Sequence, residues 1–204
     1  RGGSSPLLGT IPSTKGMNMA NYLYKNDLPA GLDLGPVVAI DCETMGLNPH
    51  RDRLCVVQMS GGDGDAHLVQ IDKGQTDAPN LAAMLENPDV LKLFHFGRFD
   101  IAAMYNAFGA LAAPVYCTKI ASKLVRTYTD RHGLKNLMQE LLDKDISKQQ
   151  QSSDWGAPKL TEAQLDYAAS DVLYLHQLRD ELNRMLAREG RVEMAQACFD
   201  FLPI

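Results

Sequence analysis

The stretch Val37–Leu47, VVAIDCETMGL, decides the fold class of this chain. Its first four residues are apolar and either small or β-branched, which is typical of a buried strand. Asp41 and Glu43 follow, two positions apart. Because residues i and i+2 of a strand point to the same face of a sheet, the stretch predicts a buried strand that ends with two neighbouring carboxylates.

Similar patterns predict further strands on either side of this stretch. The predicted strands span Pro36–Glu43, Arg53–Ser60, Ala66–Ile71 and Leu91–His95. The segment Ser60–Asp65, SGGDGD, is typical of a hairpin turn between the second strand and the third. The first half of the chain therefore predicts a sheet that contains a hairpin.

Helical periodicity takes over in the second half. Shorter predicted helices span Ala78–Asn87, Phe99–Phe108, Thr118–Arg126 and Leu134–Leu142. The longest predicted helix begins after Thr161, where Gln164 completes a capping box, and its apolar stripe continues through Met185 until Gly190 ends it. The chain begins with predicted strands, continues with alternating strands and helices, and ends with helices. This order predicts an α/β fold with a mixed β-sheet flanked by helices.

Length and composition set the domain organisation and the compartment that we expect. The 204 residues are 45% hydrophobic and 22% charged, which suits one globular domain. Residues 1–16 are rich in Gly, Ser, Pro and Thr without periodicity, so we interpret them as a tag or disordered lead and residues 17–204 as a single domain. No apolar run is long enough to span a bilayer, and the four scattered cysteines are typical of free thiols. We expect a cytoplasmic protein with no membrane partner.

Basic side chains are concentrated in one segment of an acidic chain. The formal net charge is −5, whereas proteins that track long nucleic acids usually carry a basic excess. The basic segment, residues 119–135, contains Lys119, Lys123, Arg126, Arg131, His132 and Lys135. Such a cluster most often forms a solvated face.

Asp41 and Glu43 need compensation if their strand end is buried. Two carboxylates about 4 Å apart repel by roughly 4 kcal/mol at an effective dielectric constant of about 20, and burial adds to this cost. A divalent cation compensates both charges, since hard carboxylate oxygens suit Mg²⁺ or Mn²⁺. The alternative is a strand end in solvent with two ordinary surface acids, and the pair alone favours that alternative.

Two further acids occupy notable positions in predicted helices: Asp100 at the start of one helix and Asp171 beside the apolar stripe of another. Asp100 comes shortly after the predicted strand Leu91–His95, at a helix start, where an acid usually only complements the helix dipole. Tyr167 and Asp171 share one face of the longest predicted helix. A lone tyrosine at this spacing is more often a packing residue, but a position beside the apolar stripe is a poor place for a charge without compensation.

The segments DCE, HFGRFD and YAASD, in this order and spacing, resemble the three exonuclease motifs of the DEDD superfamily. The tyrosine four residues before the last aspartate resembles the DEDDy branch, which includes ribonuclease D. The sister DEDDh branch has a histidine five residues before that aspartate, where this chain has Asp166. The resemblance covers Pro36–Leu186 and implies a ribonuclease H-like fold with 3′–5′ exonuclease activity.

Two longer segments narrow the resemblance. Residues 41–54, DCETMGLNPHRDRL, and residues 154–172, DWGAPKLTEAQLDYAASDV, resemble the stand-alone nanoRNase C family, as does the short chain. This resemblance implies hydrolysis of diribonucleotides such as pGpG to 5′ mononucleotides, and a homo-oligomer that forms an octameric ring. The acidic net charge agrees with a substrate that offers few phosphates.

The resemblance also implies a role for each site residue in a two-metal mechanism. Asp41 would bridge two divalent cations, Mg²⁺ or Mn²⁺. Glu43 and Asp171 would complete the first metal site, and Asp100 would hold the second cation. Tyr167 would orient the attacking water, because a phenol with an ordinary pKa of about 10 is a better positioner than a base near neutral pH.

Three residues are assigned to substrate binding: Met45, Leu47 and His95. Leu47 would wedge between the terminal bases, as in related exonucleases, unless it is a turn leucine in the core. Arg98 suits a phosphate contact or a surface salt bridge equally, and Trp155 suits packing better than base stacking.

Two other functions stay open at this point. A general ribonuclease D-like 3′–5′ exonuclease would trim longer RNA or single-stranded DNA, and the basic segment supports it. A non-catalytic nucleic-acid-binding module would be marked by the loss of an acid, whereas all four acids are present. The C-terminal segment 197–204, ACFDFLPI, either folds back on the domain or fills a subunit interface.

Overall fold

A mixed sheet of seven strands, in the order β1-β2-β5-β4-β3-β6-β7, organises the protein in a computed structural model that describes residues 11–12, 20–48, 50–147 and 149–204. The strands are β1 (Ile11–Pro12), β2 (Ala20–Lys25), β3 (Val37–Thr44), β4 (Leu54–Ser60), β5 (Ala66–Gln70), β6 (Leu91–Phe94) and β7 (Val115–Cys117). β4 pairs antiparallel with β3 and with β5, whereas β6 lies parallel to β3 and β7. The predicted α/β class with a mixed sheet is confirmed.

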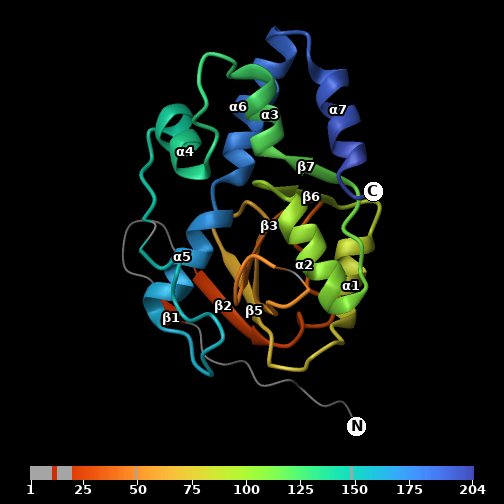
Figure 1. Cartoon of the computed structure of the whole chain (residues 1–204), viewed down its shortest axis with the longest axis vertical. Helices are drawn as coiled ribbons and strands as arrows, with labels where there is room; N and C mark the ends of the chain where they lie inside the picture. Colours follow the sequence, from red (N-terminus) through yellow and green to blue (C-terminus); the bar gives the residue numbers. More distant parts are fainter. Residues whose placement is uncertain (1–10, 13–19, 49, 148) are drawn as a thin grey trace.

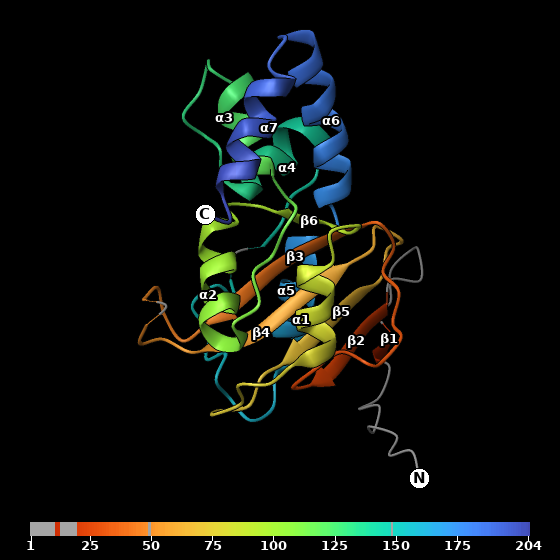
Figure 2. The ribbon, with the colours of Figure 1, turned by 90° about the vertical axis from the view of Figure 1, so that its right-hand side faces the viewer.

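The seven helices of the described residues form two layers and a separate group. They are α1 (Pro79–Glu86), α2 (Arg98–Phe108), α3 (Thr118–Val125), α4 (Leu134–Leu142), α5 (Glu162–Val172), α6 (Leu175–Arg188) and α7 (Val192–Phe201). Figure 2 shows α1 and α2 on the near face of the sheet and α5 on the far face. The helices α3, α4, α6 and α7 gather beyond β6 and β7, at the top of Figures 1 and 2.

Strand alternation divides the core between the two faces of the sheet. Val56 belongs to the cluster under α5, and its neighbour Val57 belongs to the cluster under α1 and α2. Successive side chains of a strand point to opposite faces, so one strand supplies both clusters. The four strands predicted around Val37–Leu47 are all present, whereas β1, β2 and the three-residue β7 were not predicted.

The longest predicted helix was wrong in one respect, because it is two helices. Thr161 caps α5 with the expected capping box, but the helix ends at Val172 and α6 begins at Leu175. Tyr174, between them, has non-helical backbone angles of φ −111° and ψ 0°. α5 packs against β3, β4 and β5, whereas α6 packs against α3, α4 and α7. Both helices bury an apolar stripe of the same period, so the change of direction leaves no gap in the sequence pattern.

Both ends of the chain contain residues that pair with or pack against the rest of the protein. Ile11–Pro12 pairs antiparallel with β2, while the rest of residues 1–16 lies outside the described residues, so the interpretation of a lead there stays a prediction. The C-terminal segment forms part of α7, where Phe199 is buried against Tyr116 with ring centroids 4.4 Å apart. Ile204 is 95% exposed. None of the described helices is long and apolar enough to cross a membrane.

Candidate active site

β3 presents Asp41 and Glu43 on the face of the sheet that α5 covers. In the antiparallel ladder they lie opposite Gln58 and Val56 of β4, and Val56 belongs to the core cluster under α5. The ladder shifts register between Glu43 and Thr44, where the strand ends. Both carboxylates are partly buried, so they are not ordinary surface acids at a strand end in solvent.

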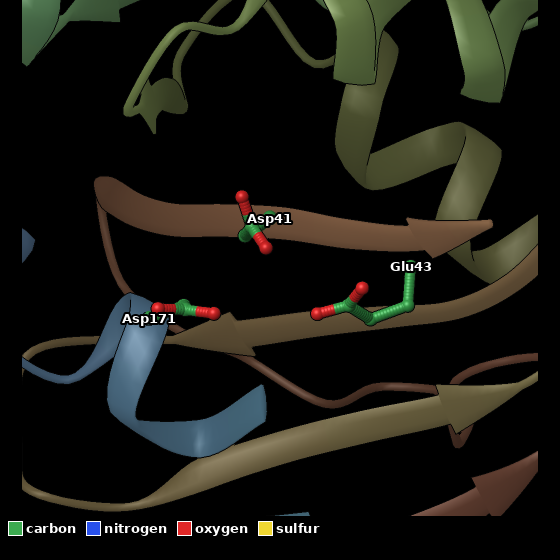
Figure 3. Close-up of side chains that lie close together, drawn as sticks. All are labelled: Asp41, Glu43 and Asp171. Atoms are coloured by element: carbon green, nitrogen blue, oxygen red, sulfur yellow. The ribbon is translucent and has the colours of Figure 1, made fainter. Parts of the chain in front are cut away.

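Asp171 completes a cluster of three carboxylates. It lies in the last turn of α5, and the packing of that helix across β3 brings it opposite the two strand acids. One carboxylate oxygen from each of Asp41, Glu43 and Asp171 lies within 4.8 Å of the other two. Figure 3 shows the carboxyl groups of Glu43 and Asp171 pointing toward each other, with Asp41 beside the space between them.

Asp100 lies next to this cluster but outside the three-residue group. It is in the first turn of α2, 4% exposed, and its Oδ1 accepts a hydrogen bond from the Cys42 backbone N–H at 3.1 Å. The sequence HFGRF allows the sharp entry to α2, because a Cβ at Gly97 would lie only 2.6 Å from the Cβ of Phe94. Glycine at this position therefore helps to place Asp100 against β3.

Burial raises the pKa values of Asp41, Glu43 and Asp100, and repulsion between acids adds to the effect at Asp41 and Glu43. Desolvation, followed by the charges of Asp100, Asp171 and Glu43, holds the pKa of Asp41 well above its usual range. Desolvation and the charges of Asp171 and Asp100 raise the pKa of Glu43 to about 9, against a hydrogen bond with Gln58 that lowers it. The pKa of Asp100 is raised to about 6 by desolvation, opposed by hydrogen bonds from Cys42.

Tyr167 lies one helical turn before Asp171 and makes a side-chain hydrogen bond with it. Burial, then the charges of Asp171, Glu43 and Asp41, raise the pKa of the phenol above its ordinary value. Tyr167 is therefore neutral at physiological pH and acts as a hydrogen-bonding group. Its ring packs against Trp155, with centroids 5.9 Å apart.

A cleft of about 740 Å³ opens over the acids. All eight residues assigned from the sequence line it: Asp41, Glu43, Met45, Leu47, His95, Asp100, Tyr167 and Asp171. Leu47 is 86% exposed, so it is not a turn leucine of the core. His95 Nδ1 lies 2.8 Å from Thr118 Oγ1, and that hydroxyl donates to the Phe94 carbonyl, which holds the imidazole at the wall of the cleft.

The other residues discussed from the sequence have different positions. Arg98 is exposed, and it is not among the described residues that line the cleft. Trp155 is 3% exposed, as expected for a packing residue, although it also lines the cleft. The basic segment is divided: Lys119 and Lys135 line the cleft, whereas Arg126 is fully buried and paired with Glu140.

Two residues of the site were not found from the sequence. Gln58 is completely buried, and its Nε2 donates to Asp41 Oδ2 at 2.8 Å. The signal was a glutamine inside the apolar strand LCVVQMS. Phe96 lines the cleft with a half-exposed ring, and Lys119 Nζ lies 3.8 Å from the centre of that ring. Its positive φ of 67° is not encoded by any simple pattern for a phenylalanine.

The donor set of the cluster fits divalent cations. All its ligand atoms are carboxylate oxygens, which Mg²⁺ and Mn²⁺ prefer. No cationic side chain among the described residues lowers the pKa values of Asp41 and Glu43, so ionising both carboxyls requires positive charge from another source. Binding of cations would supply that missing charge.

Comparison with known proteins identifies a family and relatives with similar sequences. The sequence pattern of the 3′-5′ exonuclease family matches residues 21–187. Ribonuclease D of Acidiphilium cryptum is 37% identical over 158 residues, which cover 78% of this chain and 40% of that protein. This chain therefore spans about two fifths of the length of that relative.

Solved structures with high similarity come from Brucella melitensis. NrnC bound to pGG superposes with a TM-score of 0.88 at 59% identity, covering 91% of each chain. NrnC with bound Mg²⁺ superposes with a TM-score of 0.86 at 58% identity, covering 90% of each chain. The fold, the acids and the sequence pattern agree, and this chain belongs to the 3′-5′ exonuclease family.

Proposed function

We propose that this protein is a metal-dependent 3′–5′ exoribonuclease that hydrolyses very short RNA, in particular diribonucleotides such as pGpG, to 5′ mononucleotides. The observation that carries the proposal is the convergence of Asp41, Glu43 and Asp171 at the floor of a cleft, with Tyr167 beside them. The similarity to NrnC bound to pGG, which covers 91% of each chain, supports the choice of a short substrate.

In this proposal the acids hold two divalent cations, Mg²⁺ or Mn²⁺. Asp41, Glu43 and Asp171 would hold the first, and Asp41 and Asp100 would hold the second. The bound cations would stabilise the negative charge that develops on the phosphate and make water a better nucleophile. The geometry favours cation binding, because four acids in one partly buried cleft destabilise a protein that does not bind cations.

The chain itself positions the reactants. The neutral phenol of Tyr167 orients the attacking water toward phosphorus. The oxygen of that water forms a bond to phosphorus and gives up a proton to solvent. The bond from phosphorus to the 3′ oxygen breaks, and that oxygen takes up a proton from solvent as the 3′ hydroxyl of the remaining nucleoside or nucleotide, which releases a 5′ mononucleotide. Leu47 projects from the cleft rim and would wedge between the two bases, with Met45 and His95 along the same cleft.

The distribution of basic residues supports a short substrate over a long one. Lys119 and Lys135 line the cleft, and Lys135 already pairs with Asp145 at 3.0 Å. Arg126 and His132 of the same segment are buried, where His132 bonds to Ser122. Few basic side chains of this segment are left to contact a long phosphate backbone. Because Lys119 and Lys135 are available, the trimming of longer RNA is the second candidate function.

A length series tests the substrate. Labelled RNAs of two, about five and about twenty nucleotides would be digested with Mn²⁺ and with EDTA, beside single-stranded DNA of the same lengths. We expect the dinucleotide to be hydrolysed fastest, and EDTA to stop hydrolysis of every length. Faster hydrolysis of the longest RNA would favour the general exonuclease. Full activity in EDTA would exclude the metal mechanism.

We also propose that the protein works as an octameric ring in the cytoplasm. Phe201 at the end of α7 is 72% exposed, and Ile204, three residues later, is 95% exposed, so this end of the chain has apolar surface suited to a subunit contact. The four free cysteines suit a reducing compartment. Mass photometry of the purified protein distinguishes a ring from a monomer.

A further inference from the structure

Gln58 occupies the position in β4 that faces the metal-binding acids. It lies directly opposite Asp41 in the β3–β4 ladder, so both side chains are on the same face of the sheet. The side chain is completely buried. A polar side chain keeps such a position only where it makes hydrogen bonds, because burial without them costs free energy.

The amide of Gln58 reaches two of the acids. Its Nε2 donates to Asp41 Oδ2 at 2.8 Å, and a side-chain hydrogen bond also links it to Glu43. An amide nitrogen carries two hydrogens, so one group can serve both carboxylates. When the acids are ionised, as cation binding requires, the reverse orientation of the amide would aim its oxygen at two carboxylates and is electrostatically unfavourable.

The orientation leaves the other end of the amide without a partner. Gln58 Oε1 is buried and accepts no hydrogen bond from any residue that the structure describes. An unsatisfied buried acceptor is unfavourable. The fold tolerates this loss where the nitrogen contacts the acids, which indicates that the nitrogen contacts have a role beyond stability.

The chemistry of an amide suits this role better than that of other side chains. A lysine or arginine would also donate to the carboxylates, but its charge would compete with bound cations. A glutamate would add repulsion. Glutamine is a neutral donor, so it orients the carboxylates and leaves their charge available.

We propose that Gln58 is a positioning residue that holds Asp41 and Glu43 in the arrangement that binds divalent cations. The inference rests on the proposed metal-dependent function and deepens it. Outer hydrogen-bond partners of metal ligands typically change metal affinity by about 10- to 100-fold when they are removed. Gln58 acts through the two acids and not on the RNA.

Gln70 provides a matched control. It is a buried glutamine of β5 on the same face of the sheet, since it pairs with Val56 two residues from Gln58. Its Nε2 donates to the Ala157 carbonyl at 2.9 Å. Replacement of either glutamine by methionine removes a buried amide at similar volume, but only one replacement removes donors to the acids.

The experiment measures Mn²⁺ binding to the whole protein without RNA, by calorimetric titration, in wild type, Gln58→Met, Gln58→Asn, Gln70→Met and Asp41→Asn. We expect Gln58→Met to weaken Mn²⁺ binding by about tenfold or more and Gln70→Met by less than about twofold. Gln58→Asn keeps the amide but shortens its reach, so we expect this variant to weaken Mn²⁺ binding too. It replaces Gln58→Met in the comparison if the methionine variant does not fold.

Kinetics provide a second readout. The Gln58 variants should need more Mn²⁺ for half-maximal kcat, while KM for a dinucleotide at saturating Mn²⁺ changes by less than about twofold. Mn²⁺ affinity of a folded Gln58 variant equal to wild type would overturn the inference and leave the proposed function intact. Wild-type protein that binds Mn²⁺ no better than Asp41→Asn would overturn the proposed function itself.

Discussion

Glu43 shows how a single residue links the chemistry of the site to the stability of the fold. Its pKa is raised to about 9, so the native state holds this proton more tightly than the unfolded chain does. The native state therefore loses stability, relative to the unfolded chain, as pH rises from the ordinary pKa of about 4.3 toward 9. Bound cations remove that loss, because they stabilise the ionised form.

The first prediction follows from this loss of stability with rising pH. In EDTA, the melting temperature should fall between about pH 5 and about pH 9, and Mn²⁺ should reduce the fall. Glu43→Gln cannot ionise at this position, so its melting temperature in EDTA should be higher than that of wild type near pH 8 and should depend less on pH. The same variant should lose hydrolysis. Equal melting temperatures for wild type and Glu43→Gln across this range would contradict the assignment of Glu43 to a strained carboxylate cluster.

The second prediction concerns the hydroxyl of Tyr167. Tyr167→Phe keeps the ring against Trp155 but removes the hydrogen bond with Asp171, so we expect kcat to fall by about 10- to 100-fold with little change in KM. Tyr116→Phe is the control, since the Tyr116 hydroxyl donates to Asn183 and does not line the cleft. Steady-state kinetics on a dinucleotide would compare the two. An equal loss of kcat in both would argue against a positioning role for Tyr167.

Among the individual residues, the sequence predicted the acids but not the glutamine that donates a hydrogen bond to them. Asp41 and Glu43 were predictable because strand alternation is a rigid geometric rule. Asp171 was predictable as a member of an ordered motif. Gln58 was not, since its role depends on which residue of β4 pairs with Asp41, and the register of an antiparallel pair is set by the whole sheet.

At the scale of helices and strands, the turn before α2 shows how backbone geometry places a site residue. Phe96 has a positive φ of 67°, and Gly97 approaches Phe94 so closely that no Cβ fits. This turn converts the end of β6 into a helix that starts with Asp100 in its first turn. The motif HFGRFD therefore contains both an acid and the backbone geometry that delivers it.

The third prediction tests this turn. Gly97→Ala should destabilise the protein by about 1–3 kcal/mol, because the added Cβ overlaps Phe94, and it should lower activity by moving Asp100. Gly133→Ala is the matched control: Gly133 also precedes a helix, and a Cβ there meets only Asn136 Oδ1 at 3.5 Å. We expect its stability to change by no more than about 0.5 kcal/mol. Urea denaturation measures both, and equal stabilities would show that the turn adapts without cost.

Helix and strand boundaries were predictable only where neighbouring residues determine them. The capping box at Thr161 marked the start of α5 correctly, because caps depend on neighbouring residues. The break at Leu173–Tyr174 was missed, because it arises where α5 leaves the sheet and α6 joins α3, α4 and α7. β7, with three residues, is too short to show a period of two, and its pairing with β6 alone defines it.

Charge is the property of the whole molecule that bears most directly on substrate length. The formal net charge of the chain is −5. Among the described residues that line the cleft, Lys119 and Lys135 are the lysine and arginine side chains. Lys123 lies on the same helix as Lys119 but is exposed and outside the cleft lining. The cleft therefore offers a small local positive region, while Lys123 and the exposed Arg131 lie outside its lining.

The fourth prediction uses salt to count the phosphates that the protein contacts. Single-stranded nucleic acids give a slope of about 0.7 in log affinity against log salt for each neutralised phosphate, so a dinucleotide with two phosphates should give a slope for KM no greater than about 1.4. Lys119→Gln should raise KM by about 3- to 10-fold, while Lys123→Gln should leave it unchanged. KM measured over a series of NaCl concentrations checks both expectations. A long RNA with a slope above about 3 would reveal contacts along an extended backbone, and the general exonuclease would then be the better description.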